Sequence, residues 1–145
     1  MSFFFKGDKK KKRIIKIKKT KRLEWETDPD IQDQMKEIIL VLGLDHIPPE
    51  RVFCYRTTGS KAKAYARIWS FPKIFQKALD IESAYVMEII SEKFDRLDHD
   101  NKTKVIIHEL LHIPKNFSGS LLPHKYGYTQ IEKEVDVLFK KYNGK

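Results

Sequence analysis

Apolar side chains recur every three or four positions over residues 28–44, which is the spacing of one buried face of an α-helix. Asp28 is a favourable N-cap, and Pro29 suits the first helical position. Gly43 then allows the chain to stop in a left-handed conformation. The apolar positions of this segment are Ile31, Met35, Ile38, Ile39 and Leu42. The pattern predicts an amphipathic helix that ends next to Gly43.

Three further segments are rich in β-branched and aromatic residues, which is typical of strands. The first runs from Val52 to Thr57, and the second runs from Ala62 to Trp69 with alanines on one face. The Thr58-Gly59-Ser60 sequence between them predicts a hairpin. A third strand is predicted from Tyr85 to Ile90, and a short helix that starts at Pro72 precedes it.

Two helices are predicted in the last third of the chain. The first begins at about residues 101–103 and ends before Pro114, and it has so few polar positions that we expect it to be buried in the core. Thr129 and Glu132 form a capping-box pattern for the second helix. Its apolar stripe consists of Ile131, Val135, Leu138, Phe139 and Tyr142.

Composition indicates one folded domain: the 145 residues are 41% hydrophobic and 12% aromatic. Cys54 is the single cysteine, which excludes a disulfide framework and a cysteine-based zinc site and favours the reducing cytoplasm. No apolar run is long enough to cross a membrane, and the N-terminus lacks the features of a signal peptide. We therefore expect a cytoplasmic protein with no membrane partner.

The net charge of +9 is concentrated at the N-terminus. Residues 1–22 contain eleven Lys or Arg and one Asp, whereas residues 23–145 contain eighteen Lys or Arg and nineteen Asp or Glu. We therefore expect a flexible basic extension over 1–22 and a folded domain over 23–145. The extension is either a solubilising tail or a weak electrostatic contact for nucleic acid. Its most basic stretch is Lys9, Lys10, Lys11, Lys12 and Arg13.

Residues 108–112 read His-Glu-Leu-Leu-His. On a helix, His108 and His112 lie one turn apart on the same face, so both imidazoles can reach one Zn²⁺ ion. Glu109 lies beside them, where its carboxylate can take a proton from a zinc-bound water. The alternative is a hydrogen-bonded histidine pair on a core helix. Burying two histidines and a carboxylate is costly without a partner, which favours the metal site.

The third metal ligand is open to three candidates. A metzincin would need Gly and His where this chain has Lys115 and Ser118, so that class is excluded. His124 is favoured, because the Gly-Ser turn before it could bring the chain back over the helix. Glu132 and Glu134 are alternatives, although helix capping and the helix dipole also explain carboxylates at those positions.

The oxyanion of a peptidase transition state also needs a hydrogen-bond donor. Tyr126 and Tyr128 follow His124 and could supply one, and Arg67 is a weaker candidate. His99 lies between two aspartates and is expected to be solvated. In this scheme Glu109 accepts the proton of the attacking water and later delivers it to the leaving amine.

The stretch from His108 to His124 resembles the signature of the metallopeptidase family found in phages and archaea. Residues 66–79 and 85–95 resemble central segments of the same family, and the similarity covers most of residues 30–142. The chain is also distantly similar to the minimal zincins of the SprT type, some of which act on proteins bound to DNA.

This resemblance implies an α+β, minimal zincin-like domain with zinc on three histidines and a glutamate as catalytic base. In this chain we expect a small mixed sheet of about three strands, packed with the N-terminal helix, the buried His-Glu-x-x-His helix and the C-terminal helix. We expect an extended peptide or protein substrate to pair with an edge strand, either residues 62–68 or residues 85–90.

The predicted function is thus that of a zinc metallopeptidase, a hydrolase. Two alternatives remain open. One is a non-enzymatic module that binds nucleic acid and is stabilised by zinc, in which Glu132 or His99 closes the metal site as a fourth ligand. The other is a metal-dependent amidase that acts on a substrate other than a peptide.

Overall fold

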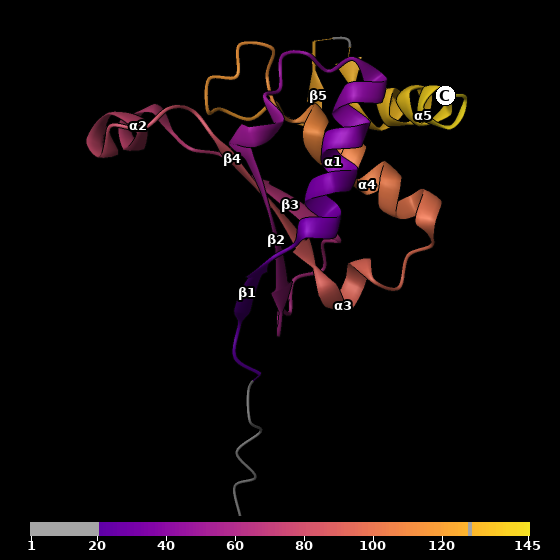
Figure 1. The fold of residues 1–145 in the computed structure, drawn as a ribbon, viewed down its shortest axis with the longest axis horizontal. Helices are drawn as coiled ribbons and strands as arrows, with labels where there is room; N and C mark the ends of the chain where they lie inside the picture. Colours follow the sequence, from indigo (N-terminus) through magenta and orange to yellow (C-terminus); the bar gives the residue numbers. More distant parts are fainter. Residues whose placement is uncertain (1–20, 128) are drawn as a thin grey trace, which may run out of the picture.

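The computed structural model describes residues 21–127 and 129–145, which form an α+β fold (Figure 1). The strands are β1 (Glu24–Thr27), β2 (Val52–Thr58), β3 (Ala66–Trp69), β4 (Tyr85–Ile90), β5 (Lys125–Tyr126) and β6 (Thr129–Gln130). The helices are α1 (Pro29–Leu42), the 3-10 helix η1 (Pro49–Arg51), α2 (Lys73–Leu79), α3 (Ser91–Phe94), α4 (His99–Leu111) and α5 (Ile131–Asn143). The predicted fold class is confirmed.

The main sheet has four strands in the order β1-β2-β4-β3, and β5 and β6 form a separate pair. Strand β4 is parallel to β2 and antiparallel to β3, while β1 is antiparallel to β2. The predicted hairpin between residues 52–57 and 62–69 is wrong, because β4 lies between these two strands. Five of the six residues of β4 are buried, which explains why this apolar segment takes a central place.

Two further expectations about the strands are corrected. The strand after Gly59 begins at Ala66 rather than at Ala62. Strand β1 was not predicted, because all four of its residues are exposed and two of them are charged. Since β4 is paired on both sides, it has no free edge for an extended peptide. Of the two candidate strands, only β3 has an edge that no strand of the described residues pairs with.

Local signals define the first helix as predicted. The Asp28 carboxylate accepts a hydrogen bond from the Ile31 backbone N–H at 3.1 Å, and Gly43 adopts a φ of 63° at the C-terminal end. Helix α4 starts at His99, a little before the predicted position, because Asp98 caps it by accepting from the Asn101 N–H at 2.8 Å.

The capping box predicted for the last helix is wrong. Helix α5 begins at Ile131, its N-cap is Gln130, and no side chain caps it. Thr129 instead belongs to β6, where it pairs with Tyr126. The Ile131 N–H is satisfied by the His124 carbonyl at 3.0 Å, which ties the start of α5 to the segment before β5.

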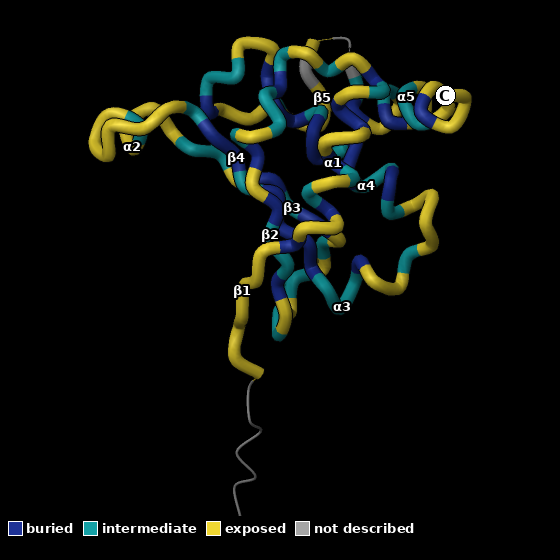
Figure 2. Tube along the Cα trace, in the orientation of Figure 1, coloured by how far each residue is buried: buried dark blue, intermediate teal, exposed yellow. Residues whose placement is uncertain are grey.

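The hydrophobic core lies between one face of the main sheet, helices α1 and α4, which pack on that face, and helix α5, which packs on α1 and α4 (Figure 1). Figure 2 shows the buried part of the chain along β2, β3, β4 and the helix faces turned towards them. Fully buried residues of α4 are Ile106, Ile107 and Leu110, and those of β4 include Met87 and Ile89. None of the helices in the described ranges is both long and apolar enough to span a bilayer.

Asp28 joins the first helix to the sheet, and its replacement should measure that contact. Its second carboxylate oxygen lies 2.8 Å from Arg56 Nε on β2, and the residue is 8% exposed. We expect Asp28→Ala to lower the free energy of unfolding by about 2–3 kcal/mol, because both the helix cap and a largely buried ion pair are lost. Asp28→Asn keeps the cap and should cost less. Urea unfolding followed by circular dichroism measures both, and equal losses would contradict this division.

Candidate metal centre

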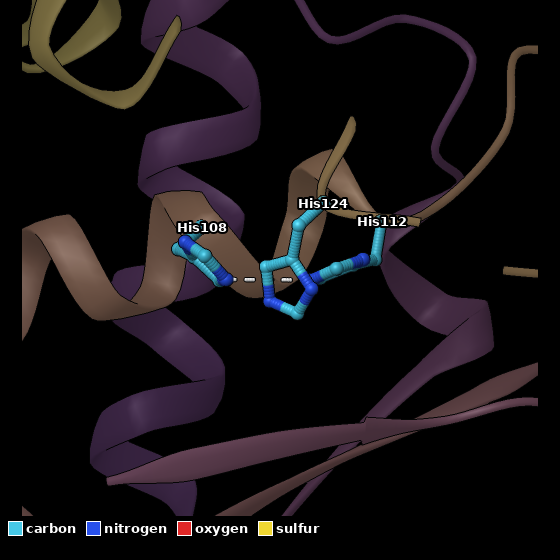
Figure 3. Close-up of side chains that lie close together, drawn as sticks. All are labelled: His108, His112 and His124. Atoms are coloured by element: carbon cyan, nitrogen blue, oxygen red, sulfur yellow. Dashed lines mark hydrogen bonds between the residues drawn. The ribbon is translucent and has the colours of Figure 1, made fainter. Parts of the chain in front are cut away.

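Three histidines converge at the C-terminal end of α4 (Figure 3). His108 and His112 stand one turn apart, and His112 is the C-cap residue of the helix. His124 comes from the segment that returns over this helix end. The Leu122 N–H donates to the His112 carbonyl at 2.8 Å, which fixes the returning segment against the helix.

A glycine and a buried tyrosine guide this returning segment. Gly119 has a φ of 92°, and a side chain there would collide with the Phe71 carbonyl oxygen. Only glycine tolerates both conditions. The Tyr85 hydroxyl of β4 accepts from the Gly119 N–H at 2.8 Å and donates to the Ser120 carbonyl at 2.8 Å. The sheet therefore sets the path that leads to His124.

The ligand nitrogens of His108, His112 and His124 all lie within 4.8 Å of one another. His112 Nδ1 lies 2.5 Å from the Leu122 carbonyl oxygen, so this nitrogen carries the proton and Nε2 has a free lone pair. His112 Nε2 is 3.3 Å from His108 Nε2. Two imidazole nitrogens on one tetrahedral zinc ion are separated by roughly 3.3–3.4 Å. The three histidines could therefore hold a metal ion.

The electrostatic environment favours neutral imidazoles. Burial lowers the pKa of His108, and the neighbouring His112 and His124 lower it further. Burial likewise lowers the pKa of His112, although its hydrogen bond to Leu122 acts in the opposite direction. Metal binding requires the deprotonated ring nitrogen, so the folded site disfavours the form that cannot bind a metal.

Glu109 lies beside this cluster and is only 9% exposed. Burial raises the pKa of its carboxyl group to about 7, although a hydrogen bond from the Ile68 backbone N–H of β3 acts against that rise. The residue lines the same cleft as the three histidines. A buried carboxylate with a raised pKa is a stronger base than an exposed one.

The cleft has a volume of about 1010 Å³ and is lined by residues of β3, α4, α5 and the returning segment. Glu132 also lines the cleft. Its negative charge raises the pKa of His108 and His112, against the effect of burial. Glu134 lines a separate cavity, on which Leu122 also borders. His99 is exposed at the start of α4 and does not line the cleft.

A buried carboxylate on β4 was missed by sequence reasoning. Glu88 is 4% exposed and accepts hydrogen bonds from Thr57 Oγ1 and Trp69 Nε1, each at 2.6 Å. Arg67 Nε lies 3.3 Å from its Oε2, close enough for an ion pair but not aligned for a hydrogen bond. Burial raises the pKa of Glu88, but these partners outweigh it and hold the pKa below its ordinary value. The position of this glutamate inside an otherwise apolar strand was the sequence feature that could have indicated a buried, hydrogen-bonded carboxylate.

Of the remaining predicted site residues, the structure describes some and leaves others outside its described part. Arg67 of β3 lines the cleft, but its role as an oxyanion donor stays a prediction. Tyr126 is in β5, but its side chain is outside the described part of the structure, and Tyr128 is not described. The basic residues 9–13 also lie outside the described residues. A transition-state role for either tyrosine and nucleic-acid contact by residues 9–13 stay predictions.

The buried Glu109 should make the stability of the metal-free protein depend on pH. Its pKa rises from the ordinary 4.5 to about 7 on folding, so the folded state holds this proton more tightly than the unfolded chain. Ionisation therefore destabilises the fold progressively as the pH rises through this window. We expect Glu109→Gln to be more stable than the parent by up to about 3 kcal/mol at about pH 8, and equally stable at about pH 4. Urea unfolding with a chelator tests this, and a difference that does not vary with pH would contradict it.

The comparisons with known proteins agree with this geometry. A family model described as "Putative phage metallopeptidase" matches residues 23–143, which include every residue of the cleft. The comparison with curated proteins found no match, and neither did the comparison with solved structures. Because the family model spans most of the chain, the protein belongs to the phage metallopeptidase family.

Proposed function

We propose that this protein is a zinc-dependent peptidase in which His108, His112 and His124 hold the metal and Glu109 is the general base. The observation that carries the proposal is the convergence of three imidazole nitrogens beside a buried carboxylate in one large cleft. The family to which the chain belongs supports the same reaction class. Peptides or proteins are the proposed substrates.

The donor set suits zinc. Three imidazoles without a thiolate, with one pair of nitrogens at tetrahedral spacing, leave a fourth position for water or substrate. Zinc bound there would lower the pKa of a water molecule and polarise the carbonyl of the substrate. The returning segment contributes by fixing His112 through the Leu122 carbonyl, so that its Nε2 faces the site.

Glu109 would move the proton of the reaction. A carboxylate oxygen takes the proton from the attacking water and then delivers it to the nitrogen of the leaving amine. Glu109 lies close enough to the Ile68 backbone of β3 for this neighbour to lower its pKa, and both residues line the wall of the cleft. This position puts the base next to the strand that has a free edge for substrate.

Strand β3 is the proposed docking site for the peptide backbone. It lies at the edge of the main sheet, and its residues line the cleft. An extended substrate that adds to this edge would form main-chain hydrogen bonds, which suit peptides of varied sequence. It would also lie alongside Glu109 and the three histidines.

One observation supports an alternative, in which the metal site is structural and the protein is not an enzyme. Glu132 lines the cleft and acts electrostatically on two of the histidines, so its carboxylate could close the metal site as a fourth ligand. His99 is unsuited to that role because it is exposed and does not line the cleft. Metal stoichiometry and activity together decide between the two.

The third ligand can be tested by metal binding alone. We expect His124→Ala to weaken zinc binding by at least about 100-fold, because one of three donors is lost. His99→Ala is the matched control, since it removes an exposed histidine at the other end of α4. Competition with a chromophoric chelator measures both affinities. If His124→Ala binds zinc like the parent while Glu132→Gln does not, the ligand set is wrong.

The general base can be tested by activity. We expect Glu109→Gln to retain zinc and to lower kcat/KM for a denatured protein substrate by about 10²- to 10⁴-fold, because proton transfer is lost. Glu134→Gln is the matched control, since Glu134 lines a different cavity. Equal cleavage by Glu109→Gln and the parent would overturn the peptidase proposal. A parent that hydrolyses only small non-peptide amides would point to an amidase.

A further inference from the structure

Every second residue from Lys61 to Lys77 is either basic or aromatic. This stretch includes the end of the loop after β2, the whole of β3 and most of α2. Residues 58–79 contain five Lys or Arg and no Asp or Glu, whereas the rest of 23–145 contains thirteen Lys or Arg against nineteen Asp or Glu. Residues 58–79 are therefore a locally basic segment in a domain that is otherwise acidic, and they include the edge strand β3.

Within β3 this alternation sorts side chains between the two faces of the sheet. Ala66 and Ile68 are buried in the core, so Arg67 and Trp69 lie on the opposite, outer face. Trp69 pairs with Val86 of β4, and Val86 pairs with Phe53 of β2, so these residues form one row across three strands. Trp69 and Phe53 are 52% and 43% exposed.

The outer face of the sheet is exposed at Phe53 and Trp69, although Glu88 and Thr57 on the same face are buried. Helices α1 and α4 cover the other face, while α2 projects away from the body of the protein (Figure 1). Figure 2 shows α2 as an exposed segment beside the sheet. Helix α2 buries none of its residues: Lys73 and Lys77 are exposed one turn apart on one side of the helix, and Phe75, which is 53% exposed, lies on another side.

The buried Glu88 holds part of this face rigid. Its carboxylate fixes the Trp69 ring through the indole N–H at 2.6 Å. The Arg67 guanidinium carbon lies 5.4 Å from the centre of the Trp69 ring, so the cation and the ring are held together. An exposed tryptophan held in one orientation loses little entropy when a flat group stacks on it. Since Glu88 offsets the charge of Arg67, the lysines supply the excess positive charge.

We propose that this basic–aromatic surface, which comprises Phe53 and Trp69 on the outer face of the sheet and the exposed basic and aromatic residues of the loop before β3 and of α2, binds single-stranded nucleic acid. Unpaired bases stack on exposed aromatic rings, and lysines neutralise the phosphates beside them. Phe53 and Trp69 are two strand spacings apart, roughly 10 Å, which leaves room for a base on each ring. A duplex hides the faces of its bases and cannot stack in this way.

The charge argues against a second copy of this chain as the occupant. If two copies met through this surface, the ten basic side chains of their two 58–79 segments would repel one another. Neither segment contains an acidic residue that could pair with them. The proposal does not rest on the peptidase activity. It places nucleic acid next to the cleft, however, because Tyr65, Arg67 and Trp69 line the cleft as well. The test therefore uses residues of α2, which do not.

The experiment measures fluorescence anisotropy of a labelled oligodeoxythymidylate, and of an oligouridylate of equal length, with the full chain at several salt concentrations. We expect Lys73→Gln/Lys77→Gln to weaken binding and to lower the slope of log affinity against log salt by about 1.4, since each phosphate contact on a single strand contributes about 0.7. Lys36→Gln/Lys140→Gln removes the same charge from α1 and α5 and should leave that slope unchanged.

The aromatic contribution is tested separately. We expect Phe75→Ala to weaken binding by about 5- to 100-fold without changing the salt slope, because stacking and not charge is lost. Leu40→Ala, at an 81% exposed position of α1, is the control and should bind like the parent. Unlabelled single strand should also compete better than duplex of the same sequence.

Several results would overturn the proposal. The surface is not the binding site if both α2 variants bind the oligonucleotides as their controls do. The stacking mode is wrong if duplex competes as well as single strand. If light scattering shows that the parent is a dimer and that Phe75→Ala converts it to a monomer with unchanged oligonucleotide affinity, the surface is an interface between copies of the chain.

Discussion

The packing of α4 against the sheet is the interaction on which the rest of the structure depends. Ile106, Ile107 and Leu110 are fully buried between the sheet and the other helices, so the rotation of α4 about its axis is fixed. With that rotation fixed, His108, Glu109 and His112 face the cleft. Burying a carboxylate and imidazoles costs free energy, and burial of the neighbouring apolar side chains offsets that cost.

The third histidine depends on a different constraint. Helix α4 ends at Leu111 with His112 as its C-cap, and the chain must return across that end to bring His124 back to the same place. Tyr85 anchors the turn at Gly119 and Ser120, and the Leu122 backbone completes the return by bonding to His112 through both its N–H and its carbonyl. One short segment therefore positions His124 and also sets the tautomer of His112. The path of the chain and the chemistry of the site share the same hydrogen bonds.

Sequence reasoning succeeded where the signal is local. The cap and stop of α1 are encoded by Asp28 and Gly43, and the apolar content of α4 predicted its burial. It failed where the outcome depends on partners distant in the sequence. The hairpin prediction was wrong because the apolar β4 competes for the same edge of β2, and the Thr129 cap was wrong because that residue joins β6. Tyr85 and Glu88 gave no local hint of the partners that they bind.

Strand β3 shows how one short element can serve two surfaces. Side chains of a strand alternate between its faces, so Ala66 and Ile68 pack in the core while Arg67 and Trp69 lie on the outer face. The backbone of Ile68 also lies close enough to Glu109 to lower the pKa of its carboxyl group, so the strand lies beside the candidate site. A shift of one residue in the pairing of β3 with β4 would exchange the two sets of side chains. It would bury Arg67 and separate Trp69 from Glu88. The hydrogen bond between Trp69 and Glu88 therefore does more than orient a ring, because it favours the one register in which the cleft wall and the outer face both form.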